Sequence, residues 1–505
     1  MVSIYEVLTA LLIVLAIMAI LWWTIFRITK SLQKSALIVA VFFILFFSFG
    51  HVLPAIGNVI LKIGVDIRSQ LMYEITLKLY LLLILWIVVF LVFLFLINRV
   101  QSDMTLTSTF MNVTSIALLI LIVFQSTQDF LILEKPIQKM VNDSINASVL
   151  DNQDPIQQTN PSEGEKPNIY YIILDGYGRN DIFNKYYEFD NKELLTYLMD
   201  NGFYIADESH SNYAHTALSL SSSLNMQYLD YVADQLGRTS NNPFPVIQLI
   251  QNSRLEKYLS DQDYTTVGFE TGYGSTELKS ADKYFSPGKT LTTFQSELIN
   301  LTPLRIWLHD FLYDTHRRRI LYTFNHLPTA IQSSQPTFVF AHITSPHTPF
   351  VFGPNGEKDH PDMEYSIRGP NAFTELAGQD EYIRRYRNQV IYLNILLRAA
   401  IDQILSQNGG NAVIVIQADH GPGSMLDWGS VENTNIEERM SILNAYYFPD
   451  QDYSNLYPGI TPVNSFRVIL DQYLGTDLGK LEDRSFFSLM ATWYDLIEVE
   501  FKPNH

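Results

Sequence analysis

Several side chains that can bind a metal ion follow short apolar stretches of the chain. They are Asp175 after residues 168–174, His342 and His347 at and after residues 337–342, and Asp419 and His420 after residues 412–417. Continuous apolar runs of this length are typical of strands that are buried on both faces of a parallel sheet. Ligands of such sheets bind at the carboxyl ends of the strands. Aspartate and histidine together favour a divalent cation such as Mn, Zn or Mg.

A hydroxyl group completes this set. Thr216 lies where a loop meets an apolar helix that is marked by Leu218, Leu220 and Leu224. A threonine there can be an ordinary helix N-cap. It can also be a nucleophile, because the helix dipole and the free N–H groups at a helix start favour an anion. A divalent metal would lower the pKa of the hydroxyl and activate it.

Each of these motifs also has an ordinary structural explanation. An Asp-Gly pair after a strand is usually a turn, and His347 between two prolines can simply stiffen a loop. The argument for a site rests on the joint pattern, because three predicted strands would deliver such residues to one edge of a sheet.

The elements that position these residues alternate along the chain. A further apolar run, residues 265–269, predicts another strand. Between residues 386 and 404, apolar side chains recur every three or four positions and predict one long amphipathic helix. Alternating strands and helices predict an α/β fold with a largely parallel sheet.

The first 140 residues differ in kind from the rest. They carry a net charge of about +3, and the following 365 residues carry about −21, against −18 for the whole chain. Four apolar stretches long enough to cross a bilayer are predicted at about residues 5–26, 35–55, 78–98 and 108–128. We therefore expect a transmembrane region at 1–140, a polar linker at 141–166 and a globular domain at 167–505.

Basic residues set the expected orientation. The first and third loops carry Arg27, Lys30, Lys34 and Arg99, and the second loop carries Lys62 and Arg68. This bias predicts that the first and third loops are cytoplasmic, and four spans then place the acidic domain outside the cell membrane. The stretches 7–26, 35–61, 79–98 and 104–128 contain no Asp, Glu, Lys or Arg, which favours an anchor over a transporter.

Composition excludes several classes of protein. The chain has no cysteine, so it has neither disulfides nor a thiolate metal site, nor a cysteine that could become formylglycine. The acidic globular part argues against nucleic acid as a partner.

Taken in order, Asp175-Gly176, Thr216, Pro346-His347 and Asp419-His420-Gly421 resemble the sulfatase-like branch of the alkaline phosphatase superfamily. Within it, the chain looks most like membrane-anchored phosphoglycerol and phosphoethanolamine transferases, including lipoteichoic acid synthases. The resemblance implies an all-α transmembrane bundle followed by an α/β, alkaline-phosphatase-like domain.

The resemblance also implies residue roles. One divalent metal, Mn first with Zn, Mg or Ca as alternatives, would be held by Asp175, Thr216, Asp419 and His420. Thr216 would become a phospho-threonine, and His347 would meet the substrate phosphate or the leaving group. His342 and Arg439 are looser candidates for substrate binding. Sulfatases carry Cys or Ser followed by Pro and Arg, where this chain has Thr216, Leu218 and Leu220.

Three functions remain open at this point. The first is transfer of a phosphoryl-linked head group, of phosphoglycerol or phosphoethanolamine type, to an envelope lipid or glycan. The second is hydrolysis of phosphodiesters, or less readily sulfate esters, at the same site with water as acceptor. The third is a non-catalytic envelope protein, which would be expected to have lost a metal ligand.

Overall fold

The computed structural model describes residues 4–62, 71–100, 105, 109, 113, 156, 165–288, 290–331, 335–360, 365, 370–407 and 409–501. The chain forms two compact units. The first comprises Met1–Ala147, Leu291–Leu312 and Pro361–Tyr365, and the second comprises Ser148–Thr290, Tyr313–His360 and Ser366–His505. Most of the expected linker, residues 141–166, lies outside the described residues, so its boundaries stay predictions.

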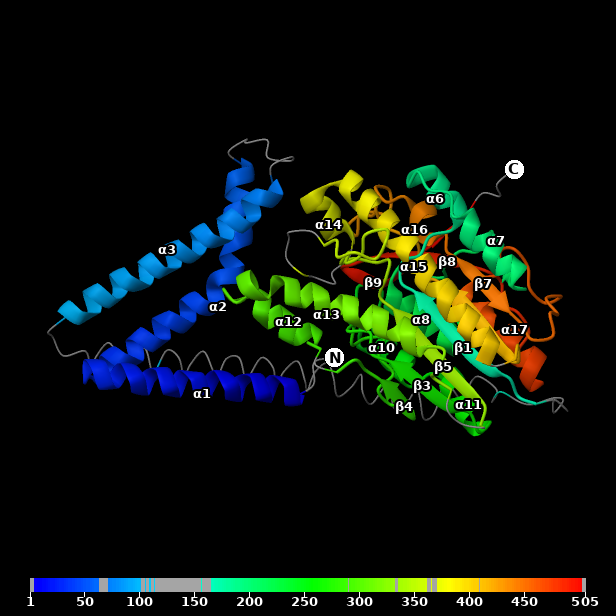
Figure 1. Ribbon diagram of the computed structural model, residues 1–505, viewed down its shortest axis with the longest axis horizontal. Helices are drawn as coiled ribbons and strands as arrows, with labels where there is room; N and C mark the ends of the chain where they lie inside the picture. Colours follow the sequence, from blue (N-terminus) through cyan, green and yellow to red (C-terminus); the bar gives the residue numbers. More distant parts are fainter. Residues whose placement is uncertain are drawn as a thin grey trace. The chain divides into compact units, whose positions relative to one another are not determined.

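Three long helices make up most of the first unit: α1 (Ile4–Thr29), α2 (Leu32–Lys62) and α3 (Leu71–Arg99) (Figure 1). Each contains a stretch apolar and long enough to cross a membrane, at Val7–Thr29, Leu32–Val52 and Leu79–Arg99. Many of their aliphatic side chains are exposed, as lipid-facing side chains are. The expected fourth span, 108–128, lies outside the described residues except for Thr109 and Val113.

The two ends of the apolar stretch of α2 have different neighbours. Near its start, the ammonium of Lys34 donates a hydrogen bond of 2.8 Å to the carbonyl oxygen of Val100, just after α3. This bond brings the first and third loops, which carry most of the basic residues, to one end of the helices. Near its other end, the amide of Gly50 donates a 3.1 Å bond to the carbonyl oxygen of Leu301.

A seven-stranded sheet forms the centre of the second unit, in the order β2-β7-β6-β1-β5-β3-β4 (Figure 1). The strands are β1 (Asn168–Leu174), β2 (Tyr204–Ile205), β3 (Thr265–Phe269), β4 (Lys283–Phe285), β5 (Thr337–Ile343), β6 (Ala412–Gln417) and β7 (Asn444–Tyr447). Neighbours pair in parallel except where β7 meets β6 and β2. The four apolar runs therefore form strands as predicted, in a largely parallel sheet.

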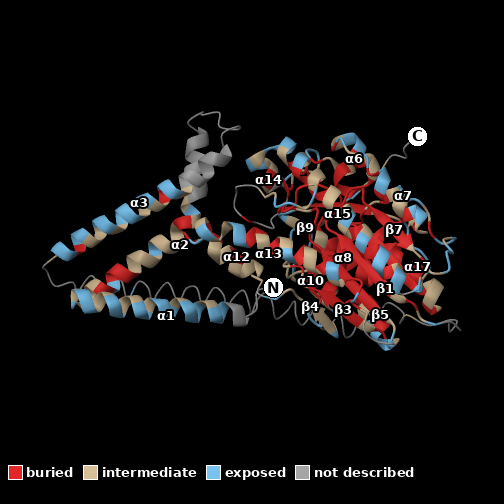
Figure 2. Ribbon diagram, in the orientation of Figure 1, coloured by how far each residue is buried: buried red, intermediate tan, exposed pale blue. Residues whose placement is uncertain are grey.

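Both faces of the central strand β1 are covered. Ile169, Tyr171 and Ile173 belong to one large core with side chains from the helices on that face. The alternate residues Tyr170 and Ile172 point to the other face and are also fully buried. Figure 2 shows the central strands of the sheet in red, the colour of buried residues. Burial on both faces explains why this strand reads as a continuous apolar run in the sequence.

The helices of that core are α8 (Thr216–Asn225), α9 (Asp230–Leu236), α10 (Phe244–Gln251), α11 (Arg254–Asp261) and α17 (Pro462–Leu474). The other described helices after β1 are α6 (Asn180–Tyr186), α7 (Lys192–Asp200), α12 (Thr293–Asn300), α13 (Arg305–His326), α14 (Pro370–Ala377), α15 (Gln379–Gln407) and α16 (Ile436–Met440). The predicted helix at 386–404 lies within α15. A separate hairpin, β8 (Ser485–Leu489) and β9 (Thr492–Val499), closes the chain.

Candidate active site

The register of the three central strands brings the acidic residues level with each other. Ile173 of β1 pairs with His342 of β5 on one side and with Gln417 of β6 on the other. Two residues further on, β1 is followed by Asp175 and β6 by Asp419. Because side chains two positions apart point to the same face, both carboxylates lie on the face that α8 covers. Ligand atoms of Asp175, His342 and Asp419 lie within 4.8 Å of one another.

The loop after β1 is held in place by its backbone. The amide of Gly176 donates a 3.0 Å hydrogen bond to Oδ1 of Asp419, and its carbonyl oxygen accepts a 2.8 Å bond from the hydroxyl of Tyr386. Gly176 has a φ of +76°, which glycine adopts without strain. This conformation turns the chain directly after Asp175 and keeps the carboxylate at the strand end.

Thr216 is the first residue of α8, and its hydroxyl points at the cluster. Its Oγ1 lies 3.1 Å from Nε2 of His420. The N-cap of α8 is His215, whose side chain makes no capping hydrogen bond, so the interpretation of Thr216 as an N-cap is wrong. As the first helical residue, Thr216 lies beside the unpaired N–H groups at the positive end of the helix.

His420 is held in one tautomer. Its Nδ1 lies 2.9 Å from the carbonyl oxygen of Gly421, which can only accept, so Nδ1 carries the proton. Nε2 of the neutral ring therefore presents a lone pair, and it lies 3.3 Å from Oδ2 of Asp419. Burial lowers the pKa of His420 well below its usual range, with a further contribution from Arg439, and so keeps the ring neutral.

The two carboxylates are unequal acids. Burial and the neighbouring charge of Asp175 raise the pKa of Asp419 to about 7. Burial also opposes ionisation of Asp175, but the neighbouring His347 and His342 outweigh it and lower the pKa of this carboxyl. Two buried carboxylates at this distance repel each other, which a cation between them would relieve.

Unpaired polar atoms in the cluster fit a metal ion. Among the described residues, Oδ1 of Asp175, Oδ2 of Asp419 and Nε2 of His342 are buried and have no hydrogen-bond partner. Such atoms are costly unless a partner satisfies them. Two carboxylate oxygens and imidazole nitrogens, gathered within a few ångströms, are a suitable donor set for a divalent cation.

The two other predicted histidines also lie at this site. Nδ1 of His342 lies 2.7 Å from Oγ1 of Thr276, and its Nε2 lies 3.4 Å from Oδ2 of Asp175, so His342 belongs with the carboxylates. The backbone amide of His347 donates a 3.0 Å bond to the carbonyl oxygen of Asp175. The rings of His347 and His420 have centroids 6.1 Å apart.

Arg439 lies beneath the site and is buried. Its Nε and Nη2 donate to the carbonyl oxygen of Ala214 at 3.1 and 2.7 Å, and its Nη1 donates to that of Gly421 at 3.1 Å. The guanidinium therefore joins the loop that carries Thr216 to the loop that carries His420. Its donors are directed at the backbone, and a role in substrate binding stays a prediction.

A pocket opens over these groups, and part of its wall was not predicted from the sequence. Asp175, Thr216, His347, His420 and Arg439 line it together with His215, Tyr273, Thr344, Trp428, Met490 and Trp493. The ring of His215 stacks on Trp428 at 4.1 Å and lies 4.9 Å from Trp493. Tyr273, His215 and Trp428 come from loops and Trp493 from the start of β9, where no periodic pattern marks them. Only the position of His215 next to Thr216 could have indicated that residue.

The second unit resembles known proteins both in sequence and in structure. A model of the sulfatase family matches residues 167–497. No curated protein matches the chain. Similar solved structures include the C-terminal periplasmic domain of EptC from Escherichia coli in complex with Zn, at 12% identity and a TM-score of 0.44, covering 68% of this chain and 96% of that one.

Two further structures extend this comparison. The lipoteichoic acid synthase LtaP from Listeria monocytogenes is 15% identical with a TM-score of 0.37, covering 71% of this chain and 81% of that one. The integral membrane lipooligosaccharide phosphoethanolamine transferase EptA from Neisseria meningitidis is 14% identical with a TM-score of 0.35, covering 77% and 74%.

Proposed function

Because this chain belongs to the sulfatase family of enzymes, we propose that it is a membrane-anchored, metal-dependent phosphotransferase. It would move a phosphoryl-linked head group, of phosphoglycerol or phosphoethanolamine type, onto an envelope lipid or glycan. The observation that carries this proposal is the position of Thr216. Its hydroxyl lies at the start of α8, 3.1 Å from a neutral histidine and beside two buried carboxylates.

The nucleophile distinguishes this chain from sulfatases that use formylglycine. Threonine cannot be converted to formylglycine, whereas its hydroxyl can attack phosphorus directly. The helix start contributes free backbone N–H groups and a positive potential where the phosphoryl oxygens would lie. These features favour phosphoryl transfer over hydrolysis of sulfate esters.

Asp175, Asp419, His420 and the Thr216 hydroxyl would hold one divalent cation, with Mn as our first choice. When bound, the cation lowers the pKa of the hydroxyl and neutralises charge on the phosphoryl oxygens. His342 lies close enough to Asp175 to orient that carboxylate, or to serve as a further ligand. Tyr386, Gly176 and Arg439 fix the loops from which these residues project.

The chain's own residues can complete both half-reactions. In the first, Oγ1 of Thr216 releases its proton to solvent and forms a bond to phosphorus, and the bond from phosphorus to the donor lipid oxygen breaks. In the second, the acceptor oxygen forms a bond to phosphorus, and the bond from phosphorus to Oγ1 of Thr216 breaks, which restores the hydroxyl. Nδ1 of His347 lies 2.6 Å from the carbonyl oxygen of Thr348 and so carries a proton, which leaves Nε2 to exchange protons with the substrate. Protonated at Nε2, His347 would protonate the leaving oxygen; neutral, it would take the proton of the acceptor hydroxyl in the second half-reaction.

The proposed setting is the plasma membrane, with the catalytic domain outside. The bond from Lys34 to Val100 supports this orientation, because it gathers the basic first and third loops at one end of the membrane helices. Gly50, near the opposite end of the apolar stretch of α2, contacts Leu301, which belongs to the same unit. Attachment beside the bilayer would raise the effective concentration of lipid substrates.

The intact mass of the full-length protein tests the proposal. Wild type, Thr216→Ala and the control Ser221→Ala, a buried hydroxyl on the same helix, are incubated with Mn²⁺ and an envelope lipid extract. We expect wild type and Ser221→Ala to gain the mass of one phosphoryl-linked head group, and Thr216→Ala to gain none. A mass gain on Thr216→Ala would reject Thr216 as the nucleophile.

The same preparation separates transfer from hydrolysis. If the group passes to a lipid or glycan acceptor, turnover of the donor rises when glycerol or a sugar acceptor is added. Turnover that does not respond to acceptors, with release of the free phosphorylated head group, would instead assign the hydrolase reaction to this site.

A further inference from the structure

A segment inserted between β4 and β5, residues 291–312, groups with the membrane helices rather than with the sheet. It contains α12 and the first turns of α13. The amide of Gly50 in α2 donates a 3.1 Å bond to the carbonyl oxygen of Leu301, at the end of α12. A Cβ at Gly50 would lie 2.5 Å from the carbonyl oxygen of Asn300, so the two backbones meet where glycine leaves room.

The place of this contact along α2 is informative. Lys34 marks one end of the apolar stretch, and Gly50 lies sixteen residues further along the helix. At 1.5 Å per residue this is about 24 Å, which approaches the roughly 30 Å thickness of the hydrocarbon core. The connection between α12 and α13 therefore lies near the membrane surface opposite the basic loops.

Three large apolar side chains are exposed directly after this contact. Leu304 is 42% exposed, Trp307 61% and Phe311 43%. The spacing of three and four residues puts them on one face of the helix, while Arg305, on a different face, is buried. The other exposed large apolar residues described beyond residue 165 are scattered over three helices and the β8–β9 turn: Met199, Leu376, Ile395 and Met490.

We infer that the stripe Leu304–Trp307–Phe311 is a membrane-binding surface whose occupant is the lipid head-group layer. The stripe continues from a contact with a membrane-spanning helix, whose own exposed aliphatic side chains face lipid. Tryptophan is enriched at this depth, because its ring is apolar and its N–H is polar. An amphipathic helix binds the interface through such a face.

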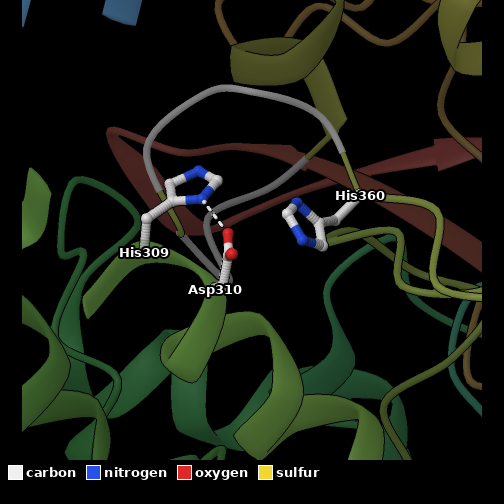
Figure 3. A group of neighbouring side chains, drawn as sticks. All are labelled: His309, Asp310 and His360. Atoms are coloured by element: carbon white, nitrogen blue, oxygen red, sulfur yellow. Dashed lines mark hydrogen bonds and ion pairs between the residues drawn. The ribbon is translucent and has the colours of Figure 1, made fainter. Parts of the chain in front are cut away.

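Polar neighbours limit how deep the stripe can lie. Nδ1 of His309 lies 3.2 Å from Oδ1 of Asp310 (Figure 3). The Asp310 side chain, next to Phe311 in the sequence, is 82% exposed. Burying such a carboxylate in hydrocarbon is costly. The stripe is therefore expected in the interfacial layer, with Asp310 in contact with water.

The absence of cysteine makes a direct test practical. Trp307→Cys and the control Met199→Cys, an exposed apolar residue on α7, each introduce one thiol into the full-length chain. Each is labelled with a nitroxide and reconstituted in vesicles of phosphatidylethanolamine and phosphatidylglycerol. The accessibility of the label to oxygen, which concentrates in lipid, is compared with its accessibility to a water-soluble nickel complex.

We expect the oxygen-to-nickel ratio to be several-fold higher at residue 307 than at residue 199. Equal ratios at the two sites would overturn the proposal. A second copy of the chain could also shield the label at residue 307 from nickel. In that case the spectrum would show spin–spin broadening that disappears when labelled protein is diluted with unlabelled protein, and this result would also overturn the proposal. Labelling at Leu304→Cys repeats the test if Trp307→Cys does not fold. The measurement does not depend on catalysis.

Discussion

The backbone amide of Gly176 donates a hydrogen bond of 3.0 Å to Oδ1 of Asp419, which joins the loops that follow β1 and β6. Because this bond occupies Oδ1, the other oxygen of Asp419 is directed into the cluster, 3.3 Å from Nε2 of His420. The carboxylate is thus oriented before any cation binds. Preorganisation of this kind is what an electrostatic site requires.

Asp419→Asn is expected to weaken binding of Mn²⁺ by at least about tenfold, because it removes a negative charge and a donor oxygen from the cluster. Isothermal titration of the full-length protein measures the affinity. Chelation of the metal should also lower the Tm of wild type, because a ligand at about 100 times its Kd contributes roughly 2.7 kcal/mol to stability.

The control for this prediction is Asp207→Asn, an exposed carboxylate in the same unit. It should bind Mn²⁺ as wild type does and lose the same stability on chelation. Equal affinity of Asp419→Asn and wild type would contradict the proposed ligand set.

Arg439→Met is expected to destabilise the protein by about 3–5 kcal/mol, because it removes both guanidinium donors to the buried carbonyl oxygen of Ala214 and one of the two donors to that of Gly421. Denaturant unfolding measures the change. Arg238→Met is the matched control, since that side chain is 75% exposed and its ion pair with Asp495 spans 3.8 Å. A loss as small as that of the control would mean that Arg439 does not hold the two loops together.

Gly50→Ala is expected to lower the Tm of the protein in detergent. Alanine favours a helix over glycine by about 1 kcal/mol, so helix propensity alone predicts the opposite sign. The expected loss comes from the added Cβ, which would lie 2.5 Å from the carbonyl oxygen of Asn300. Gly459→Ala, where the added Cβ meets nothing within 4 Å, should be neutral or slightly stabilising. A Tm for Gly50→Ala at or above that of wild type would argue against the close contact.

Glu256→Gln is expected to change how stability depends on pH. Burial, with a smaller contribution from Asp282, raises the pKa of Glu256 to about 7 in the folded protein, above its usual value of 4.5. Ionisation is therefore harder in the folded state, and the wild type loses stability as the pH rises from about 4.5 to 7. Tm measured across this range should fall less for Glu256→Gln than for wild type. If the Tm of both proteins falls equally over this range, the pKa of Glu256 is not raised in the folded protein. Glu482→Gln, which changes an exposed carboxylate, serves as the control.

The sheet and the identity of the site residues could be read from the sequence. Runs such as 168–174 and 412–417 are apolar along almost their whole length and do not alternate with polar residues. The reason is that both faces of these strands are buried. Asp175, His347, Asp419 and His420 each lie within four residues of the end of a strand, so the rule that parallel sheets bind ligands at their carboxyl ends was sufficient to group them.

The sequence alone therefore determined the four apolar strands β1, β3, β5 and β6, the long helix α15, three of the four predicted apolar helices and the residues that gather around Thr216. Only the tertiary structure decided that His342 joins the carboxylates, that Arg439 binds backbone carbonyls, and that Trp428 and Trp493 wall the pocket. It also decided that residues 291–312 belong with the membrane helices. The physical reason is that burial and periodicity are local properties, which leave a pattern along the chain. Contacts between loops depend on the path of the whole backbone, and a stripe such as Leu304–Trp307–Phe311 has the same pattern whether a core or a membrane covers it.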